Sequence, residues 1–429
     1  MKNGHDNDVS IMIKSDMPAP LSSNSSPQTG EREAVLLRKS YDKTHKVNGN
    51  RLLLLQNGAA YFPQLCADID ACKSFIYLET YIFSADETGR QVSEALQRAA
   101  RRDVVVRVLM DGFGSADFPP HWRTQLQEAG VQVQWFRREI SPFTWRRNRK
   151  RRLLRLHRKL VVLDGEVAFI GGINIIDDTK HNVAVPRFDF AVRVEGSVAG
   201  EIYAVMRRLW GAVSWANASG KRIERFMLGN GRRSALPNVA VYLRDNLRHR
   251  RDIERAYMKA IIAAQHEVVI ANAYFLPGLS FRRTLMQAAE RGVRVILLLQ
   301  GRVEYRLLHY ATHALYAELL AAGIEIYEYQ ASYLHAKVAV VDGLWVTVGS
   351  SNIDPFSLLL AREANLVVSD AGFAAELRDK LFAAISQDAL RINPAHWNRV
   401  GWGGHLLARL SYATVRMVIG VLGYGKSVD

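Results

Sequence analysis

The sequence predicts an α/β protein built from two α/β/α sandwich repeats, with mixed, largely parallel sheets related by a pseudo-twofold axis. Three observations predict this fold: strand-like and helix-like runs alternate, their order recurs once, and a polar motif closes each copy at the same spacing. Alternation of strand, helix and strand is typical of βαβ units, in which helices cover a sheet of parallel strands.

The repeats divide the chain into five parts. Residues 1–48 are rich in Ser, Asn, Asp and Pro and lack apolar periodicity, which predicts a flexible tail. We expect the first repeat at 49–218, a linker punctuated by Gly and Pro at 219–238, the second repeat at 239–400, and an amphipathic C-terminal segment at 401–429. The length fits two or three domains at about 100–200 residues each.

Corresponding runs recur in the two repeats. The first has strand-like runs at 75–83 and 104–112 around a helix-like run ending at 102; the second has strand-like runs at 268–277 and 293–301 around a helix-like run at 285–291. Each copy continues with a helix that ends in a glycine, Gly130 or Gly323, and with another strand. We therefore expect the same α/β unit twice.

Composition excludes several classes of protein. Hydrophobic residues make up 48% and charged residues 23%, which is typical of a packed globular protein and excludes wholesale disorder. Two cysteines, Cys66 and Cys72, are too few for a disulfide scaffold or a four-cysteine zinc site, and we expect reduced thiols. Lys and Arg number 57 against 42 Asp and Glu, and the resulting charge of +15 favours an anionic partner, nucleic acid or an anionic membrane.

Targeting segments are not expected. The first residues carry scattered charges without an apolar core, so no secretory signal is predicted. No uninterrupted apolar run of about 20 residues is found, so no membrane-spanning helix is predicted.

The polar motif at the end of each repeat reads His-x-Lys-x4-Asp-x6-Gly-[Gly/Ser]-x-Asn. The first copy consists of His157, Lys159, Asp164, Gly171, Gly172 and Asn174, and the second of His335, Lys337, Asp342, Gly349, Ser350 and Asn352. A single His-Lys pair on a strand is usually surface chemistry. Agreement at five positions, four of them polar, in two copies is difficult to obtain by chance, so the motif indicates a functional site.

Local geometry gathers these side chains at one end of a hairpin. His and Lys two residues apart on a strand point to the same face, and Asp-Gly is a turn signal between two apolar strands. A turn at Gly165-Glu166 places Asn174 opposite His157, and a shifted turn places Gly172 there; the same count applies to the second copy. Small residues at this end would let a ligand approach the backbone.

These residues resemble the phospholipase D superfamily, whose signature is a duplicated His-Lys-Asp motif, and the repeated strands extend the resemblance over residues 49–400. Within that superfamily the sequence is similar to bacterial cardiolipin synthases, in the shorter subgroup that lacks two N-terminal transmembrane helices. The supporting stretches are Tyr81-Ile-Phe with Gly89 downstream, Asp111-Gly112, the run from Arg250 to Tyr257 and the run from Ala271 to Pro277.

The motif supplies what cleavage of a phosphodiester requires: a nucleophile, a proton donor for the leaving alkoxide, and fixed positive charge. Two histidines can fill the first two roles, because modest pKa shifts hold one imidazole neutral and the other protonated. Lys159 and Lys337 would neutralise the non-bridging oxygens, and Asn174 and Asn352 would donate hydrogen bonds to them. No metal-ligand cluster is found outside the motif, so we expect neither a metal nor another cofactor.

The resemblance implies the individual roles. One histidine forms a phosphatidyl-histidine, and the other acts as general acid and then as general base for the incoming alcohol; family precedent favours His157 as nucleophile and His335 as acid. Asp164 and Asp342 belong to the signature and are counted with its catalytic set, although their position at hairpin turns favours local turn stabilisation.

Each imidazole needs a carboxylate behind it to fix its tautomer. The best candidates are Asp189 for the first repeat and Glu363 for the second, each on the strand that follows its motif, and Glu79 is a weaker candidate. The remaining histidines considered lack a counterpart in the other repeat and are expected to be ordinary; they are His181, His309 and His313.

Two segments suggest a membrane surface. Residues 137–158 carry ten Lys and Arg against one acid, Glu139, with aromatic residues interleaved, which suits an anionic bilayer or nucleic acid, or a solvated loop. A smaller basic cluster spans 244–251. Residues 403–424 are apolar at helical spacing with Arg409 and Arg416 on another face, which suits a helix in the lipid interface or one packed on the domain.

The hypothesis we favour is a cardiolipin synthase that moves a phosphatidyl group from a phosphatidylglycerol-type donor to a second phosphatidylglycerol. We expect a peripheral enzyme on the cytoplasmic side of a bacterial inner membrane, with phospholipid substrates, an anionic membrane surface and no nucleic acid as partners. The alternative is a phospholipase D-type hydrolase or nuclease that uses water as acceptor. A non-catalytic nucleic-acid-binding protein is a third possibility, but a pure binder has no need of both histidines.

Overall fold

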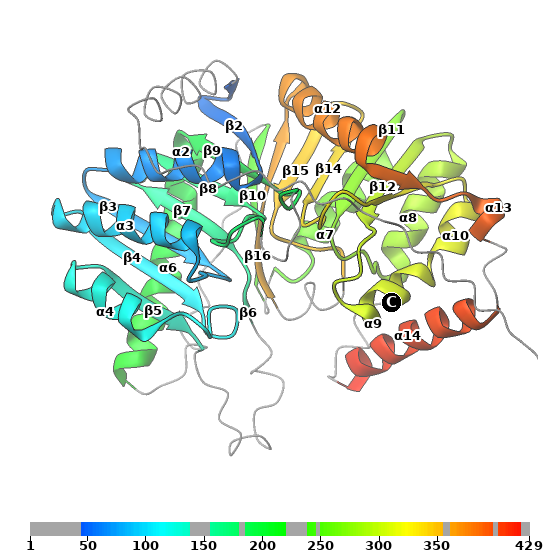
Figure 1. Ribbon diagram of the computed structural model, residues 1–429. Helices are drawn as coiled ribbons and strands as arrows, with labels where there is room; N and C mark the ends of the chain where they lie inside the picture. Colours follow the sequence, from blue (N-terminus) through cyan, green and yellow to red (C-terminus); the bar gives the residue numbers. More distant parts are fainter. Residues whose placement is uncertain are drawn as a thin grey trace, which may run out of the picture.

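The computed structural model describes residues 44–137, 155–179, 185–219, 238–245, 249–354, 361–397 and 402–421, arranged as two α/β units side by side (Figure 1). The two mixed α/β repeats predicted from the sequence are confirmed. The predicted linker lies largely outside the described residues, as do residues 1–43 of the predicted tail.

The first sheet has eight strands in the order β1-β2-β9-β8-β7-β3-β4-β5. They are β1 (His45–Val47), β2 (Asn50–Gln56), β3 (Phe75–Thr80), β4 (Val105–Asp111), β5 (Gln132–Phe136), β7 (Lys159–Leu163), β8 (Val167–Gly171) and β9 (Phe190–Glu195). Parallel pairing is found in the section β3-β4-β5, whose strands are joined by α3 (Glu87–Arg101) and α4 (Pro120–Glu128). The remaining pairs are antiparallel, and two of them, β1–β2 and β7–β8, are hairpins closed by short turns.

The second sheet repeats this plan. It contains β10 (Val239–Arg244), β11 (Glu267–Asn272), β12 (Arg294–Gln300), β13 (Glu325–Tyr329), β14 (Lys337–Val341), β15 (Trp345–Gly349), β16 (Ala361–Ser369) and β17 (Ala389–Arg391). The parallel section is β11-β12-β13, connected through α8 (Leu279–Glu290), α9 (Arg306–His313) and α10 (Tyr316–Ala321). The ninth strand, β6 (Arg155–Leu156), comes from the first repeat and pairs with β16.

Helices cover the outer face of each sheet. In the first repeat, α2 (Asn57–Ala71) and α3 pack on the sheet through one apolar cluster. In the second repeat, α7 (Asp252–Ala263) and α8 do the same, and α14 (Trp402–Val421) follows the short α13 (Pro394–Trp397) and lies along α9 (Figure 1). No helix in these ranges combines the length and the hydropathy needed to cross a bilayer.

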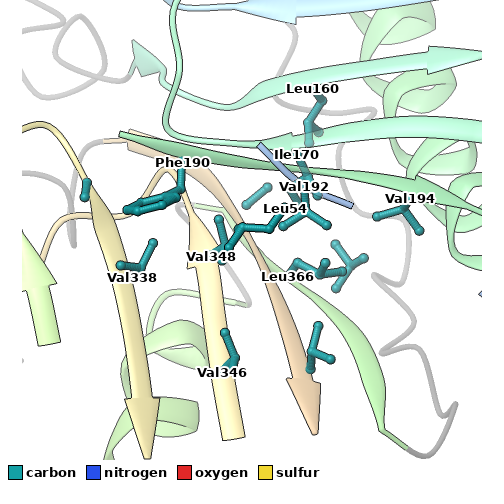
Figure 2. Packing of buried hydrophobic residues seen from close by; sticks show 14 of the residues in the cluster. Leu54, Leu160, Ile170, Phe190, Val192, Val194, Val338, Val346, Val348 and Leu366 are labelled. Atoms are coloured by element: carbon teal, nitrogen blue, oxygen red, sulfur yellow. The ribbon is translucent and has the colours of Figure 1, made fainter. Parts of the chain in front are cut away.

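The inner faces of the two sheets share a single core. Figure 2 shows Leu54 and Phe190 of the first sheet close to Val338, Val348 and Leu366 of the second. The helices α6 (Ser197–Ser219) and α12 (Ala371–Asp388) contribute to the same cluster, so each sheet lies between helical layers. Burial of this apolar surface holds the repeats together.

The hairpin of each motif has a three-residue turn, which corrects both predicted registers. Leu163 pairs with Val167 and Lys159 with Gly171, so neither Asn174 nor Gly172 lies opposite His157. The reason is that Asp164 joins the turn in the left-handed region, with a φ of 53°. The second hairpin has the same form, since Val341 pairs with Trp345.

The first strand begins within the segment predicted to be a tail. His45–Val47 pairs with β2 through a turn formed by Asn48 and Gly49, which have φ values of 47° and 73°. Asn-Gly is the preferred sequence for such a tight turn, because both positions require a positive φ. The boundary expected at residue 48 is therefore wrong by four residues.

Candidate active site

The two motifs meet where the repeats exchange short backbone segments. The backbone N–H of His157 donates to the carbonyl of Arg362, next to the pairing of β6 with β16. The N–H of His335 donates to the carbonyl of Phe188, which precedes β9. Each histidine segment is thus attached to the other repeat, and the exchange is reciprocal, as the pseudo-twofold relation requires.

The histidine–carboxylate pairs cross between the repeats. Nδ1 of His157 lies 2.9 Å from Oε1 of Glu363, and Nδ1 of His335 lies 2.6 Å from Oδ2 of Asp189. Asp189 and Glu363 were the expected carboxylates, but their assignment to the histidine of the same repeat is wrong. Since Arg362 and Phe188 bind the backbone of the opposite histidines, the acids that follow them reach the opposite rings.

A carboxylate on Nδ1 leaves Nε2 as the nitrogen available for chemistry on each ring. Burial lowers the pKa of His157, partly offset by Glu363, and burial together with Lys337 and Lys159 holds the pKa of His335 well below its usual value. Both imidazoles are therefore neutral at pH 7 before an anion binds.

Two buried ammonium groups lie beside the histidines. Lys159 begins β7 and Lys337 begins β14, and each Nζ donates to the backbone carbonyl of the histidine two residues earlier, at 2.7 Å for Lys159. Burial lowers the pKa of Lys159 to about 7 and also lowers the pKa of Lys337. Burial of a charge without a counter-ion is unfavourable, so an anionic ligand would stabilise both ammonium groups.

Asn174 and Asn352 lie buried just beyond β8 and β15, at the same edge as the lysines. Oδ1 of Asn174 accepts a hydrogen bond of 3.3 Å from the N–H of Ile82, which fixes the orientation of the amide. The NH2 group remains the donor that Asn174 can offer to a ligand.

The small residues of the motif make room for the carboxylates rather than for a ligand, which corrects the sequence-based interpretation. A Cβ on Gly172 would lie 2.3 Å from Oδ1 of Asp189, so a side chain there would displace the acid. At the corresponding position, Oγ of Ser350 donates a hydrogen bond of 2.5 Å to Oε2 of Glu363.

The two pairs therefore have different surroundings. Arg244 lies directly opposite Glu363 in the β10–β16 ladder and is buried, whereas Asn57 holds the backbone of Asp189 through its own N–H and Oδ1. Although burial opposes ionisation, His157 and Lys159 hold the pKa of Glu363 below its usual range. Burial raises the pKa of Asp189 to about 6.

A polar side chain positions the segment before each histidine. Asp111, at the end of β4, accepts a hydrogen bond of 2.7 Å from the N–H of Leu156. Gln300, at the end of β12, accepts one of 2.7 Å from the N–H of Leu334. Neither role was expected from the sequence.

Two further side chains beside the site were missed. The ring of Tyr81 lies 4.8 Å from the ring of His157, and Nζ of Lys159 lies 5.3 Å from the centre of the Tyr81 ring. Arg187 is close enough to lower the pKa of His335. The available signals were their positions, directly after β3 for Tyr81 and two residues before Asp189 for Arg187.

Asp164 and Asp342 lie at the other end of their strands, about 16 Å from the lysines at the rise of an extended chain. Asp164 accepts hydrogen bonds from the N–H groups of residues 73, 74 and 75, and Asp342 from those of residues 265, 266 and 267. They bind the loops that lead into β3 and β11, far from the histidines, so we expect them to stabilise the fold rather than to take part in the chemistry.

The other candidates lie elsewhere. Glu79 forms a buried ion pair of 2.7 Å with Arg158, so it does not orient a catalytic imidazole. His313, the last residue of α9, pairs with Glu328 at 3.0 Å, and the ring of His309, one turn earlier on the same helix, lies 4.1 Å from the His313 ring. His181 and most of the basic run 137–158 lie outside the described residues.

The arrangement can cleave a phosphodiester. It combines two imidazoles oriented by carboxylates, two ammonium groups and a fixed amide, which are the groups needed for attack, proton donation and charge neutralisation. Among the residues described, no group of three or more His, Cys, Asp or Glu side chains is placed to hold a metal ion.

Comparison with known proteins agrees with this geometry. Residues 65–210 and 257–385 match the family described as cardiolipin synthase, PLD-like domain, and each matched segment contains one complete motif. The chain belongs to this phospholipase D-like family of cardiolipin synthases.

Two curated relatives support the same assignment, and a solved structure shares the fold. The chain is 36% identical to cardiolipin synthase B of Escherichia coli (strain K12), over 88% of this chain and 90% of that protein. It is 30% identical to cardiolipin synthase A of Cronobacter sakazakii, over 85% of this chain and 75% of that protein. The crystal structure of phosphatidylserine synthase from Haemophilus influenzae shares the fold, with a TM-score of 0.68 and 14% identity over 92% of this chain and 99% of that one.

Asp164→Ala should lower stability and leave the chemistry intact. Loss of a carboxylate that binds three backbone N–H groups at a partly exposed site should cost about 1–2 kcal/mol, as for loss of a helix cap. Burial raises the pKa of Asp164, but the hydrogen bonds from these donors outweigh burial and hold the pKa below its unfolded value of about 3.9. Its stabilisation is therefore complete above that value and is lost as the pH falls through the folded pKa.

The measurement is urea unfolding at neutral and acidic pH, with the exposed neighbour Glu166→Ala as control. Turnover per folded molecule should be unchanged in both variants. A variant of Asp164 with full stability and lost turnover would return this residue to the catalytic set.

Proposed function

We propose that the protein is a cardiolipin synthase that transfers a phosphatidyl group between two phosphatidylglycerol-type lipids and releases glycerol. The main support for the proposal is that each histidine pairs with a carboxylate of the opposite repeat, with two buried lysines beside these pairs. The family match and the relatives named cardiolipin synthase support the choice of substrate.

In the first step, Nε2 of His157 attacks the phosphorus of the donor lipid. The bond from phosphorus to the headgroup glycerol oxygen breaks, and His335, protonated once the anion is bound, gives its proton to that oxygen. Glycerol leaves, and the phosphatidyl group remains on His157. Lys159 and Lys337 neutralise the charge on the non-bridging oxygens, and the amides of Asn174 and Asn352 donate to them.

In the second step, a headgroup hydroxyl of the acceptor lipid attacks the phosphorus. Neutral His335 now takes the hydroxyl proton, and the bond between phosphorus and His157 breaks. Cardiolipin forms, His157 is restored, and His335 is again protonated for the next cycle.

The different surroundings of the two carboxylates support this assignment of roles. Glu363 has a lowered pKa and stays ionised, which favours the positive charge that His157 acquires when it carries phosphorus. Asp189 has a pKa of about 6, so the pair that it forms with His335 can hold a proton near neutral pH, as a general acid must.

We also propose that the enzyme works as a peripheral protein on the cytoplasmic face of a bacterial inner membrane, without a nucleic-acid partner. The basic run at 137–158 supports attraction to an anionic leaflet, because each basic residue near such a surface contributes about 1 kcal/mol. Its described ends, Arg137 and Arg155, adjoin the strand edge that holds the active site.

The test of the proposed function is to incubate purified protein with phosphatidylglycerol vesicles in EDTA and analyse the lipids by mass spectrometry. Cardiolipin and glycerol are the expected products, since no step requires a metal. Phosphatidic acid alone would assign a hydrolase. Unchanged lipid together with cleavage of DNA would assign a nuclease and contradict the proposal.

His157→Ala and His335→Ala should each abolish cardiolipin formation, because both steps need both rings. The double variant should be no slower than either single variant, since residues that act as a unit are not additive. A donor with an activated leaving group should label His157 in the His335→Ala variant, read by peptide mass spectrometry. A label on His335 in wild-type protein would reverse the two roles.

The rate constant kcat/KM should fall as the pH rises through about 7. The pKa of Lys159 in the free enzyme is about 7, so above that pH the ammonium loses the charge that binds phosphate. A pH profile on detergent-dispersed lipid measures this. In Lys159→Arg, whose side chain stays charged, the residual activity should lack this decline, and persistence of the decline would assign it to another group.

A further inference from the structure

One narrow face of α14 attaches this helix to the second repeat. Ala408, Ser411 and Val415 are buried, and Val415 belongs to the apolar cluster that includes α7 and α8. The hydroxyl of Tyr412 lies 3.4 Å from a guanidinium nitrogen of Arg282 on α8. The spacing of these residues defines a single stripe, along which α14 lies against α9 (Figure 1).

A second apolar stripe lies on the opposite side of the same helix. Leu406, Leu407, Leu410 and Met417 are 46%, 45%, 56% and 64% exposed. At about 100° per residue, the centre of this group lies roughly half a turn from Val415. A helix that needed only to pack on the domain would carry polar residues there.

Two arginines lie between the stripes. Arg409 and Arg416 are seven residues apart, so they share one flank of the helix, about a third of a turn from the centre of the exposed leucines. Basic side chains in this position can reach the phosphate level of a lipid leaflet while the apolar stripe is immersed.

The helix α9, along which α14 lies, follows the strand edge that holds the active site. Val303, Tyr305 and Leu307 are exposed between β12 and the first turn of α9, and β12 ends at the edge where Lys337 begins β14. Phe113 is exposed just after β4, at the corresponding edge of the first sheet. These exposed apolar side chains thus follow strands that end at the same sheet edges as the two lysines.

We propose that the outer face of α14, formed by Leu406, Leu407, Leu410 and Met417, inserts into the interfacial layer of an anionic phospholipid leaflet and so presents the active-site edge to the membrane. The choice of lipid as occupant rests on the proposed function, because the phosphodiester to be attacked lies at headgroup depth. The basic flank of the helix complements the anionic headgroups, and the exposed side chains beside α9 continue the surface toward the histidines.

The test is sedimentation of the full-length protein with vesicles of equal parts phosphatidylglycerol and phosphatidylcholine. Leu406→Gln combined with Leu410→Gln should weaken vesicle binding by about tenfold or more, since two large apolar side chains no longer leave water. Turnover of detergent-dispersed phosphatidylglycerol should be unchanged, which also verifies that the variant is folded.

Matched controls separate this face from general hydrophobicity. Ile262→Gln combined with Leu344→Gln removes two equally exposed apolar side chains at the opposite strand edge and should bind vesicles as the wild type does. Thr414→Leu adds an apolar group beside Leu410 and should strengthen binding. We expect high salt to weaken vesicle binding less for the wild type than for the double leucine variant. Such a difference would show that the helix adds an apolar contribution to the electrostatic attraction.

Equal vesicle binding by the wild type and the double leucine variant would overturn the inference. Self-association of the wild type, lost in that variant without a change in vesicle binding, would assign the face to a second copy of the chain and overturn it as well. Helix-dependent binding without cardiolipin formation would support the docking face and refute the proposed function. If the double leucine variant forms cardiolipin on vesicles as fast as the wild type, the proposed function is supported and the docking face is refuted.

Discussion

The structure depends on the reciprocal exchange of hydrogen bonds between the two repeats. The N–H of His157 binds the second repeat and the N–H of His335 binds the first, and each imidazole completes its pair with a carboxylate from the opposite side. Neither repeat holds an oriented imidazole by itself. The shared apolar core therefore has a chemical role as well as a structural one, because it fixes the distance across which each histidine meets its acid.

Burial of charge is the second feature of the site. Two lysines and two acids lie buried beside two largely buried histidines, so the charge of each group is set mainly by its neighbours rather than by water. The two halves are not equivalent: Glu363 has Ser350 and Arg244 around it, whereas Asp189 has Gly172 and Asn57. This asymmetry within a pseudo-symmetric frame supports the proposal that one imidazole attacks while the other moves a proton.

The motif contains residues with two different purposes. Its histidines and lysines serve the site, whereas its aspartates fix the loops at the far end of the same hairpins. Its small residues leave space for a carboxylate or for the neighbouring strand. A sequence motif records positions that the fold requires as well as those that the chemistry requires, and spacing alone does not separate them, because a strand places both kinds on one continuous run.

The sequence by itself determined the two mixed α/β repeats, the duplicated motif and the identity of both carboxylates, because apolar periodicity and local spacing are properties of contiguous chain. The hairpin register predicted from the sequence was wrong, because a turn that is one residue longer or shorter shifts every pair of facing residues along the two strands. Only the tertiary structure decided that His157 meets Glu363 and that His335 meets Asp189. Contacts between distant segments depend on how the two sheets pack, and that packing is set by the whole shared core rather than by any local pattern.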